Sequence, residues 1–135
     1  MSISVLFSEF MELMNPTSIF NAFWATGFGI IVGMLPGLTA TMGVALLTGL
    51  TFRFMPEQAM VVLISTYVGS IYGGSRSAIL LNIPGTPANA ATCIDGNPLA
   101  RRGEAGYAIG LATTSSGIGT FFGLVLGVAA AILIT

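Results

Sequence analysis

The chain has 135 residues, of which 7% are charged and 54% are hydrophobic. A soluble domain carries about 25% charged residues, so this chain has too few to cover a water-exposed surface, and we expect an integral membrane protein. The formal net charge of -1 offers no basic patch and argues against nucleic acid as a partner. With no histidine and one cysteine, the chain lacks the residues for His- or Cys-based metal sites, disulfide frameworks and Cys/His or Ser/His catalysis.

The first fifteen residues predict a separate element. Residues 2–14 carry apolar side chains at three- and four-residue spacing, with Glu9 and Glu12 between them. This pattern favours an amphipathic helix in the membrane interface over residues 1–15, and a tail packed on the rest of the protein is the alternative. A signal peptide is excluded because there is no basic region at the start. Residues 16–135 are predicted to form a polytopic transmembrane region.

Long stretches without charge follow. They cover residues 13–52, 58–75, 77–94 and 105–135. Because a spanning helix needs about 20 apolar residues, they allow roughly three to five crossings. The first stretch is too long for one crossing and is interrupted at Leu35-Pro36-Gly37, which predicts limbs over 18–35 and 38–52. A third limb is predicted over 57–75.

The stretch 77–94 has the length of a crossing but carries Pro84, Gly85 and Pro87 among polar side chains. Broken backbone at membrane depth is tolerated only where protein buries it or water reaches it. We therefore expect a re-entrant or unwound element that lines a cavity. Residues 95–104 predict a polar turn. Residues 105–135 predict one tilted helix and part of another, and their end inside an apolar run suggests a truncated chain.

Small residues recur at four-residue spacing in several segments. Such faces let helix backbones approach closely in lipid, so they predict helix packing. The runs are Gly29, Gly33 and Gly37; Gly69 and Gly73; Gly106 and Gly110; and Ser115, Gly119, Gly123, Gly127 and Ala131.

The two Pro-Gly breaks, at Pro36-Gly37 and Pro84-Gly85, are the strongest functional signal in the chain. Paired broken hydrophobic segments are typical of transporter sites, because an interrupted helix exposes N–H groups for anions and carbonyls for cations. Ordinary proline kinks are the alternative. Arg76 could neutralise a carboxylate substrate or extend to the lipid headgroups. The Arg101-Arg102 pair places its loop in the cytoplasm by the positive-inside rule.

Two long segments resemble the large membrane subunit of the tripartite tricarboxylate transporters, the TctA family. They are GIIVGMLPGLTATMGVALLTGLTF (residues 29–52) and YGGSRSAILLNIPGTPANAATCIDGNPLARRG (residues 72–103). The resemblance implies a secondary transporter of the bacterial inner membrane that imports citrate or related organic acids, coupled to Na⁺ or H⁺. It also implies two partners, a small membrane subunit and a periplasmic solute-binding protein.

The resemblance further implies which residues face the transport site. They are Gly33, Pro36, Gly37, Thr39, Tyr72, Gly73, Gly74, Ser75, Asn82, Pro84, Gly85, Thr86 and Pro87. Arg76 joins them as a candidate ligand of the substrate, although many relatives are expected to carry a smaller or uncharged residue there. Members of the family are several times longer than this chain, so only their N-terminal part is matched.

Other functions are weighed beside transport. A small oligomeric channel, complete at 135 residues, would explain the glycine runs, and so would a scaffold subunit without a transport site. Neither explains the polar segment from Asn82 to Thr92. An enzyme is not expected, because the chain offers no nucleophile with its base and no membrane Asp pair.

Overall fold

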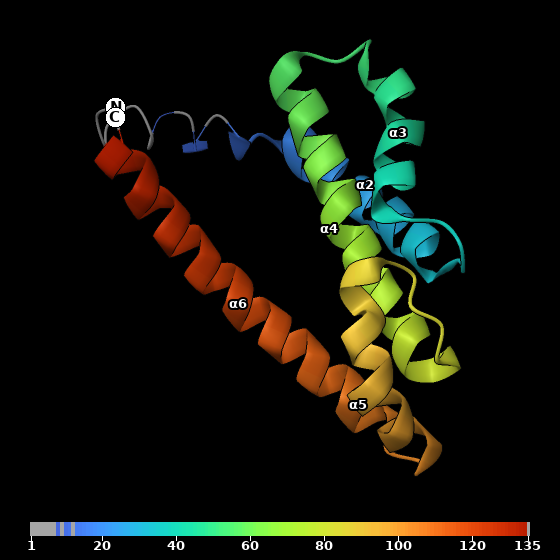
Figure 1. The fold of residues 1–135 in the computed structure, drawn as a ribbon. Coiled ribbons are helices and arrows are strands. Elements are labelled where there is room, and N and C mark those ends of the chain that lie inside the picture. Colours follow the sequence, from blue (N-terminus) through green and yellow to red (C-terminus); the bar gives the residue numbers. More distant parts are fainter. Residues whose placement is uncertain (1–7, 9, 12, 135) are drawn as a thin grey trace.

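The computed structural model describes residues 8, 10, 11 and 13–134. This part of the chain is built from helices and contains no strand, which confirms the all-α prediction. Figure 1 shows α2, α3 and α4 gathered in one bundle, with α5 against the lower end of α4 and α6 leaving at an angle. The elements in chain order are α2 (Pro16–Met34), α3 (Ala40–Thr51), α4 (Pro56–Leu81), the 3₁₀ turn η1 (Pro87–Asn89), α5 (Ala90–Arg101) and α6 (Ala105–Ile134).

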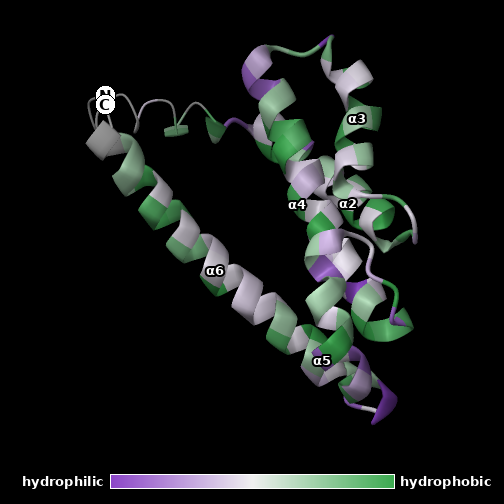
Figure 2. Ribbon diagram, viewed as in Figure 1, coloured by the Kyte–Doolittle hydropathy of each residue, from purple (hydrophilic) through white to green (hydrophobic). Residues whose placement is uncertain are grey.

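Two of these helices, α2 and α6, are long and apolar enough to cross a membrane. Helix α3 is apolar but has 12 residues, too few to span. Helix α4 has 26 residues but is more polar. In Figure 2 hydrophilic segments mark the start of α4 and the turn between α5 and α6, whereas α6 is coloured mostly white to green. The described helices therefore supply two candidate spans, fewer than the stretches of uncharged sequence suggest.

Helices α2 and α4 pack side by side and run in the same direction. Near their starts, the Asn21 amide donates a hydrogen bond to Gln58, and near the other end Gly33 packs on Ser70. Helix α3 follows α2 in the sequence and carries the chain back to the level where α4 begins, so that α2 and α4 can run in parallel. The Thr39 hydroxyl caps α3 by accepting the Met42 backbone N–H at 3.3 Å.

Glycines allow the close approach of α2 and α4. A Cβ added to Gly29, Gly33, Gly69 or Gly73 would collide with a backbone carbonyl oxygen of the facing helix. The two predicted glycine runs thus meet each other, and backbone packs directly on backbone. Gly37, by contrast, has no such neighbour. The carbonyls that would be struck belong to Thr66, Ser70, Thr26 and Ile30.

Helix α5 lies against α4 and also runs parallel to it. The Asn89 amide donates to the Ile71 carbonyl, and the Asn97 amide donates to the Ile79 carbonyl, each over 3.0 Å and each across 18 residues of sequence. The segment between Leu81 and Asn89 therefore carries the chain back along α4 before α5 begins, as Figure 1 shows.

The predicted polar turn over residues 95–104 is wrong for most of its length. Residues up to Arg101 are helical, and the turn is confined to residues 102–104. Tertiary contacts explain the difference. Gly96 packs on the Ile79 side chain so closely that a Cβ would lie 2.7 Å from it, and the Asn97 tether holds the same turn of helix.

Residues 105–134 form one uninterrupted helix, α6, rather than a helix and part of another. Its 30 residues extend about 45 Å at 1.5 Å per residue, long enough to cross a membrane with tilt. Every residue from Thr114 to Ala131 is exposed, and Gly119, Gly123 and Gly127 have no neighbour within 4 Å of an added Cβ. The same holds for Gly106 and Gly110, so within the described structure only the glycines on α2 and α4 pack on another helix as the predicted runs suggested.

The amphipathic helix predicted over residues 1–15 lies largely outside the described residues, because 1–7, 9 and 12 are not among them. Its location in the membrane interface stays a prediction.

Candidate functional site

The second Pro-Gly segment begins where α4 ends. Asn82 adopts a left-handed conformation with φ 59°, which asparagine tolerates better than most residues, and its N–H donates to the Ala78 carbonyl over 3.1 Å. Residues 83–86 are not helical, and they lead back to η1. The side chains of Pro84 and Pro87 are exposed.

Three glycines meet where this segment returns to the bundle. A Cβ on Gly85 would collide with the Gly33 carbonyl oxygen and would lie 2.7 Å from the Gly74 Cα. A Cβ on Gly74 would collide with the Asn89 amide and would lie 3.3 Å from the Thr86 nitrogen. The structure thus brings Gly33, from the end of α2, together with Gly74 and Gly85, all of them residues singled out in the sequence.

Two buried polar side chains hold the segment in place. Thr86 and Asn89 are each 5% exposed, and Asn89 Nδ2 donates to Thr86 Oγ1 over 2.9 Å as well as to the Ile71 carbonyl. Both amide protons of Asn89 therefore have acceptors, so the donor that fixes the segment is satisfied without water.

The first Pro-Gly motif lies away from this cluster. Leu38 N–H bonds the Leu35 carbonyl over 3.2 Å, with Pro36 and Gly37 between them and Gly37 at φ 91°. Proline followed by a residue of positive φ is the pattern of a type II turn. Pro36 and Gly37 are exposed, and Thr39 serves as the cap of α3. Within the described chain, these three residues connect α2 to α3 rather than joining Gly85.

A cavity of about 360 Å³ opens between α4, α5 and α6 beside the returning segment. Its polar lining comprises Tyr72, Ser75, Asn89, Thr92, Ser115 and Ser116. The Ser75 hydroxyl donates to the Tyr72 carbonyl over 2.7 Å, so its lone pairs remain available. The hydroxyls of Thr92, Ser115 and Ser116 are available as donors.

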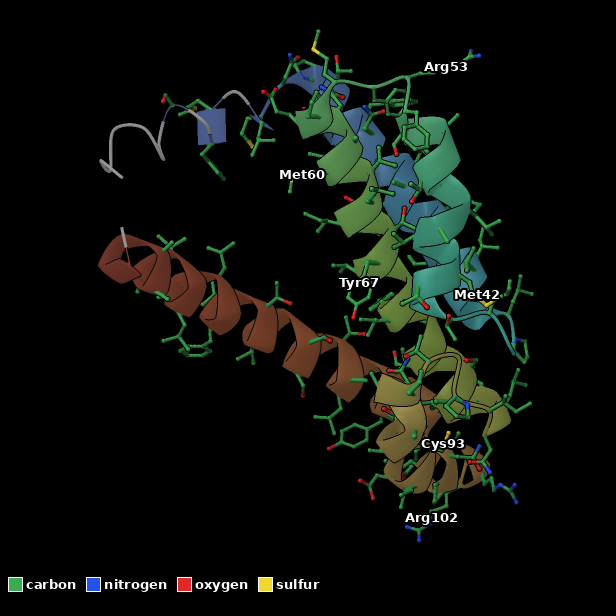
Figure 3. The ribbon with its side chains drawn as sticks, turned by 45° about the horizontal axis from the view of Figure 1, so that its top comes forward. Met42, Arg53, Met60, Tyr67, Cys93 and Arg102 are labelled. Atoms are coloured by element: carbon green, nitrogen blue, oxygen red, sulfur yellow. The ribbon has the colours of Figure 1, made fainter. Side chains whose placement is uncertain are left out.

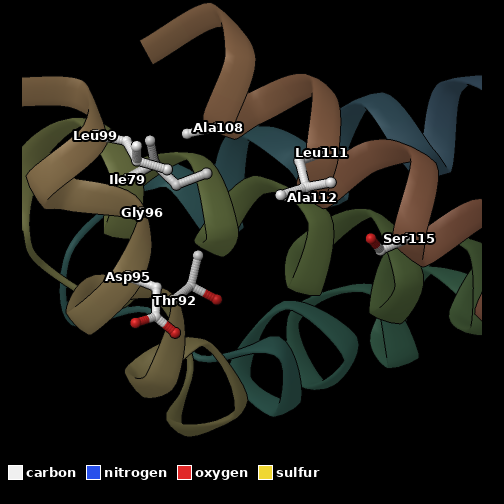
Figure 4. Close-up of a pocket in the computed structure, with 9 residues that line it drawn as sticks. All are labelled: Ile79, Thr92, Asp95, Gly96, Leu99, Ala108, Leu111, Ala112 and Ser115. Atoms are coloured by element: carbon white, nitrogen blue, oxygen red, sulfur yellow. The ribbon is translucent and has the colours of Figure 1, made fainter. Parts of the chain in front are cut away.

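Two further cavities adjoin the first. One, of about 230 Å³, shares Thr92, Ala112 and Ser115 with it, and Figure 4 shows Thr92 and Asp95 on α5 with Ser115 on α6. The other, of about 510 Å³, lies between α2, α4 and α6 and shares Tyr72 and Ser116. Together the three cavities lie along much of the side of α6 that faces the bundle.

Arg76 lies next to Tyr72, which lines two of these cavities, although Arg76 itself is not among the lining residues. Its guanidinium carbon is 3.3 Å from the centre of the Tyr72 ring, Nη1 donates to the Tyr72 carbonyl over 3.1 Å, and Nη2 donates to Thr113 Oγ1 over 3.2 Å. These contacts hold the charge between α4 and α6, and the side chain is half-buried. Among the described residues no group of three His, Cys, Asp or Glu side chains could hold a metal ion.

Sequence reasoning left several lining residues outside the candidate site. Asn89 and Thr92 were visible only as polar members of the broken segment, and Ser115 only as a member of a small-residue run. The signal that could have found Thr113 and Ser116 is the run Thr113-Thr114-Ser115-Ser116, four hydroxyls inside an otherwise apolar stretch.

The sequence model of the "Tripartite tricarboxylate transporter TctA family" matches residues 19–135. The chain belongs to the TctA family. A relative from Agrobacterium vitis, "Uncharacterized 52.8 kDa protein in TAR-I ttuC' 3'region", is 40% identical over 120 residues, which are 89% of this chain and 23% of the relative. This chain thus spans about a quarter of the length of that relative. No solved structure matches the chain.

Membership places the chain in a family of transporters rather than of enzymes. The family and the two apolar helices, α2 and α6, together support a membrane location.

Proposed function

We propose that this chain forms part of the translocation pathway of a cation-coupled transporter that imports tricarboxylates or related organic acids. In this proposal it works in the bacterial inner membrane with a small membrane subunit and receives substrate from a periplasmic solute-binding protein. Family membership supports the class of transporter. The observation that carries the proposal is the broken segment around Gly85, folded against Gly33 and Gly74 beside a hydroxyl-lined cavity.

The lining suits a small organic acid. A carboxylate oxygen accepts hydrogen bonds, and Thr92, Ser115 and Ser116 supply hydroxyl donors. Arg76 brings a positive charge next to these cavities, since its partners Tyr72 and Thr113 line them, and its planar guanidinium matches the geometry of a carboxylate. A site of neutral donors with one arginine can select an anion without a cluster of basic residues.

The arrangement of helices supports a multi-pass protein with a broken element at membrane depth. Helix α4 extends about 39 Å by its 26 residues, so in our proposal it spans together with α2 and α6. The returning segment after Leu81 would then lie inside the membrane, where its non-helical backbone faces protein and the cavity rather than lipid. Coupling by Na⁺ or H⁺ completes the proposal.

Uptake of radiolabelled citrate tests this function. The complete coding sequence is expressed with its partner subunits, and initial rates are compared with those of Asn82→Ala and Thr86→Ala. Both variants are expected to lower uptake at unchanged membrane abundance, because Asn82 sets the left-handed end of α4 and Thr86 holds the returning segment. Thr114→Ala is the matched control, since Thr114 is exposed and lines none of the three cavities.

Other outcomes would contradict the proposal. Wild-type uptake in both Asn82→Ala and Thr86→Ala would remove the broken segment from the transport site. Ion currents from the purified protein in planar bilayers, without any binding protein, would favour the alternative of a small oligomeric channel. If the wild type took up none of the organic acids tested, the alternative of a scaffold subunit without a transport site would be favoured.

A further inference from the structure

Two asparagines, Asn89 at the end of η1 and Asn97 on α5, make the same tether to α4 but use their oxygens differently. Asn89 and Asn97 are eight residues apart, are both buried, and donate through Nδ2 to the Ile71 and Ile79 carbonyls. Asn97 Oδ1 accepts a hydrogen bond from Arg101 Nε over 2.9 Å. No donor in the described chain reaches Asn89 Oδ1.

The orientation of the Asn89 amide is fixed by its neighbours. The Ile71 carbonyl can only accept, so the NH₂ group must face it, and the oxygen must point the other way. Among the described residues, every side-chain oxygen or nitrogen atom that is itself fully buried has a hydrogen-bond partner. Because Asn89 Oδ1 has no partner, this atom must be reached by solvent, although the residue as a whole is only 5% exposed. Asn89 is among the residues that line the cavity of about 360 Å³, and this is the opening toward which we place Oδ1.

An acceptor in this position has consequences for the ligand. Carboxylate oxygens only accept hydrogen bonds, so they can pair with Thr92, Ser115 and Ser116 but not with Asn89 Oδ1. The ligand needs a donor of its own to satisfy that oxygen. Among small organic acids the simplest such donor is a hydroxyl group.

We infer that Asn89 makes this cavity selective for hydroxy acids, with Oδ1 accepting the substrate hydroxyl while the hydroxyls of Thr92, Ser115 and Ser116 bind the carboxylates. This inference rests on the proposed function and names the substrate class of the same site. A site built to pair with a hydroxyl discriminates against the analogue that lacks it, because binding the analogue leaves a desolvated acceptor unpaired.

Citrate and tricarballylate provide the test, because they differ only in the hydroxyl group. The complete protein is purified without the solute-binding protein, so that the latter contributes no selectivity, and ligand binding is measured from the concentration that half-maximally raises the melting temperature. Wild type is expected to bind citrate about tenfold or more tighter than tricarballylate.

The variants separate the oxygen from the tether. Asn89→Ala is expected to bring the two acids to equal affinity. Asn97→Ala, the matched control, loses the equivalent bond to α4 but not the cavity-facing oxygen, and should keep the wild-type preference. The comparison of the two acids on wild type does not depend on whether a variant folds.

Each outcome decides something. Equal affinity of wild type for both acids would overturn the inference while leaving the proposed function standing, and so would an unchanged preference in Asn89→Ala. A variant that shifts the Na⁺ requirement but not the preference would assign Asn89 Oδ1 to the cation instead. Binding of neither acid to wild type would overturn the proposed function and this inference with it.

Discussion

Gly85 faces the carbonyl oxygen of Gly33 so closely that no Cβ could fit between them. The two residues come from segments far apart in the sequence, each containing a Pro-Gly pair. Their contact places the returning segment at the point where α2 and α4 pack, and it explains why small residues are needed on all three pieces of backbone.

Replacing Gly33 by alanine is expected to destabilise the protein by about 1–3 kcal/mol, since the new methyl group overlaps the Ser70 carbonyl. Gly27 is the matched control, because it lies on α2 with nothing within 4 Å of an added Cβ. Gly27→Ala should be neutral or stabilise by up to about 1 kcal/mol. Thermal unfolding in detergent measures both, and equal melting temperatures would contradict the backbone-on-backbone packing.

Thr39 can be tested as a cap separately from any role in transport. Thr39→Val removes the bond to the Met42 N–H and should cost about 1 kcal/mol, whereas Thr39→Asn restores a good cap. We expect stability and citrate uptake to recover together in Thr39→Asn. If stability recovered but uptake did not, the result would support the sequence-based prediction that Thr39 faces the transport site.

Arg76 should matter more than its partner on α6. Arg76→Gln removes the charge and is expected to lower citrate uptake by more than tenfold, while Arg76→Lys keeps the charge but loses the fork and the stacking on Tyr72. Thr113→Val removes one hydrogen bond worth about 1 kcal/mol, so it is expected to lower citrate uptake by roughly fivefold. Initial rates normalised to membrane abundance give the order. A wild-type rate in Arg76→Gln would exclude the guanidinium from substrate binding.

Our proposal that α4 crosses the membrane predicts that its two ends lie on opposite sides. Arg53 and Arg102 lie at opposite ends of the molecule in Figure 3. With Cys93→Ser as background, Arg102→Cys is expected to react with an impermeant maleimide only from the cytoplasmic side, and Arg53→Cys only from outside. Labelling of both cysteines from one side would show that α4 does not cross.

The sequence predicted the starts of α2 and α4 and the end of α2 well, because their signals are local. The end of the third limb, predicted at residue 75, was wrong, because α4 continues to Leu81. Pro16 and Pro56 begin α2 and α4, and the Leu35-Pro36-Gly37 turn ends α2, without help from the rest of the chain. The glycine runs on α2 and α4 also indicated correctly that helices would pack there, although not that the two runs would face each other.

The course of the chain after Leu81 could not be predicted in the same way. Asp95, Gly96, Asn97 and Pro98 are typical of a turn, yet they form helix because Gly96 and Asn97 fit against Ile79. The cavity could not be predicted from the sequence either, because it also depends on tertiary packing. Its polar lining comes from three helices, and only their packing brings Ser75, Asn89 and Ser116 together.

The direct contact between the backbones of α2 and α4 also determines which parts of the molecule can move. No side chain lies between Gly33 and Ser70 that could change rotamer, so sliding would drive a carbonyl oxygen into a Cα. Helix α6 instead meets α4 through side chains, among them those of Arg76 and Thr113, which share a hydrogen bond. Alternating access requires one body to rock against another. We therefore expect α2 and α4 to travel as a rigid unit during transport, with the change of angle occurring at α6.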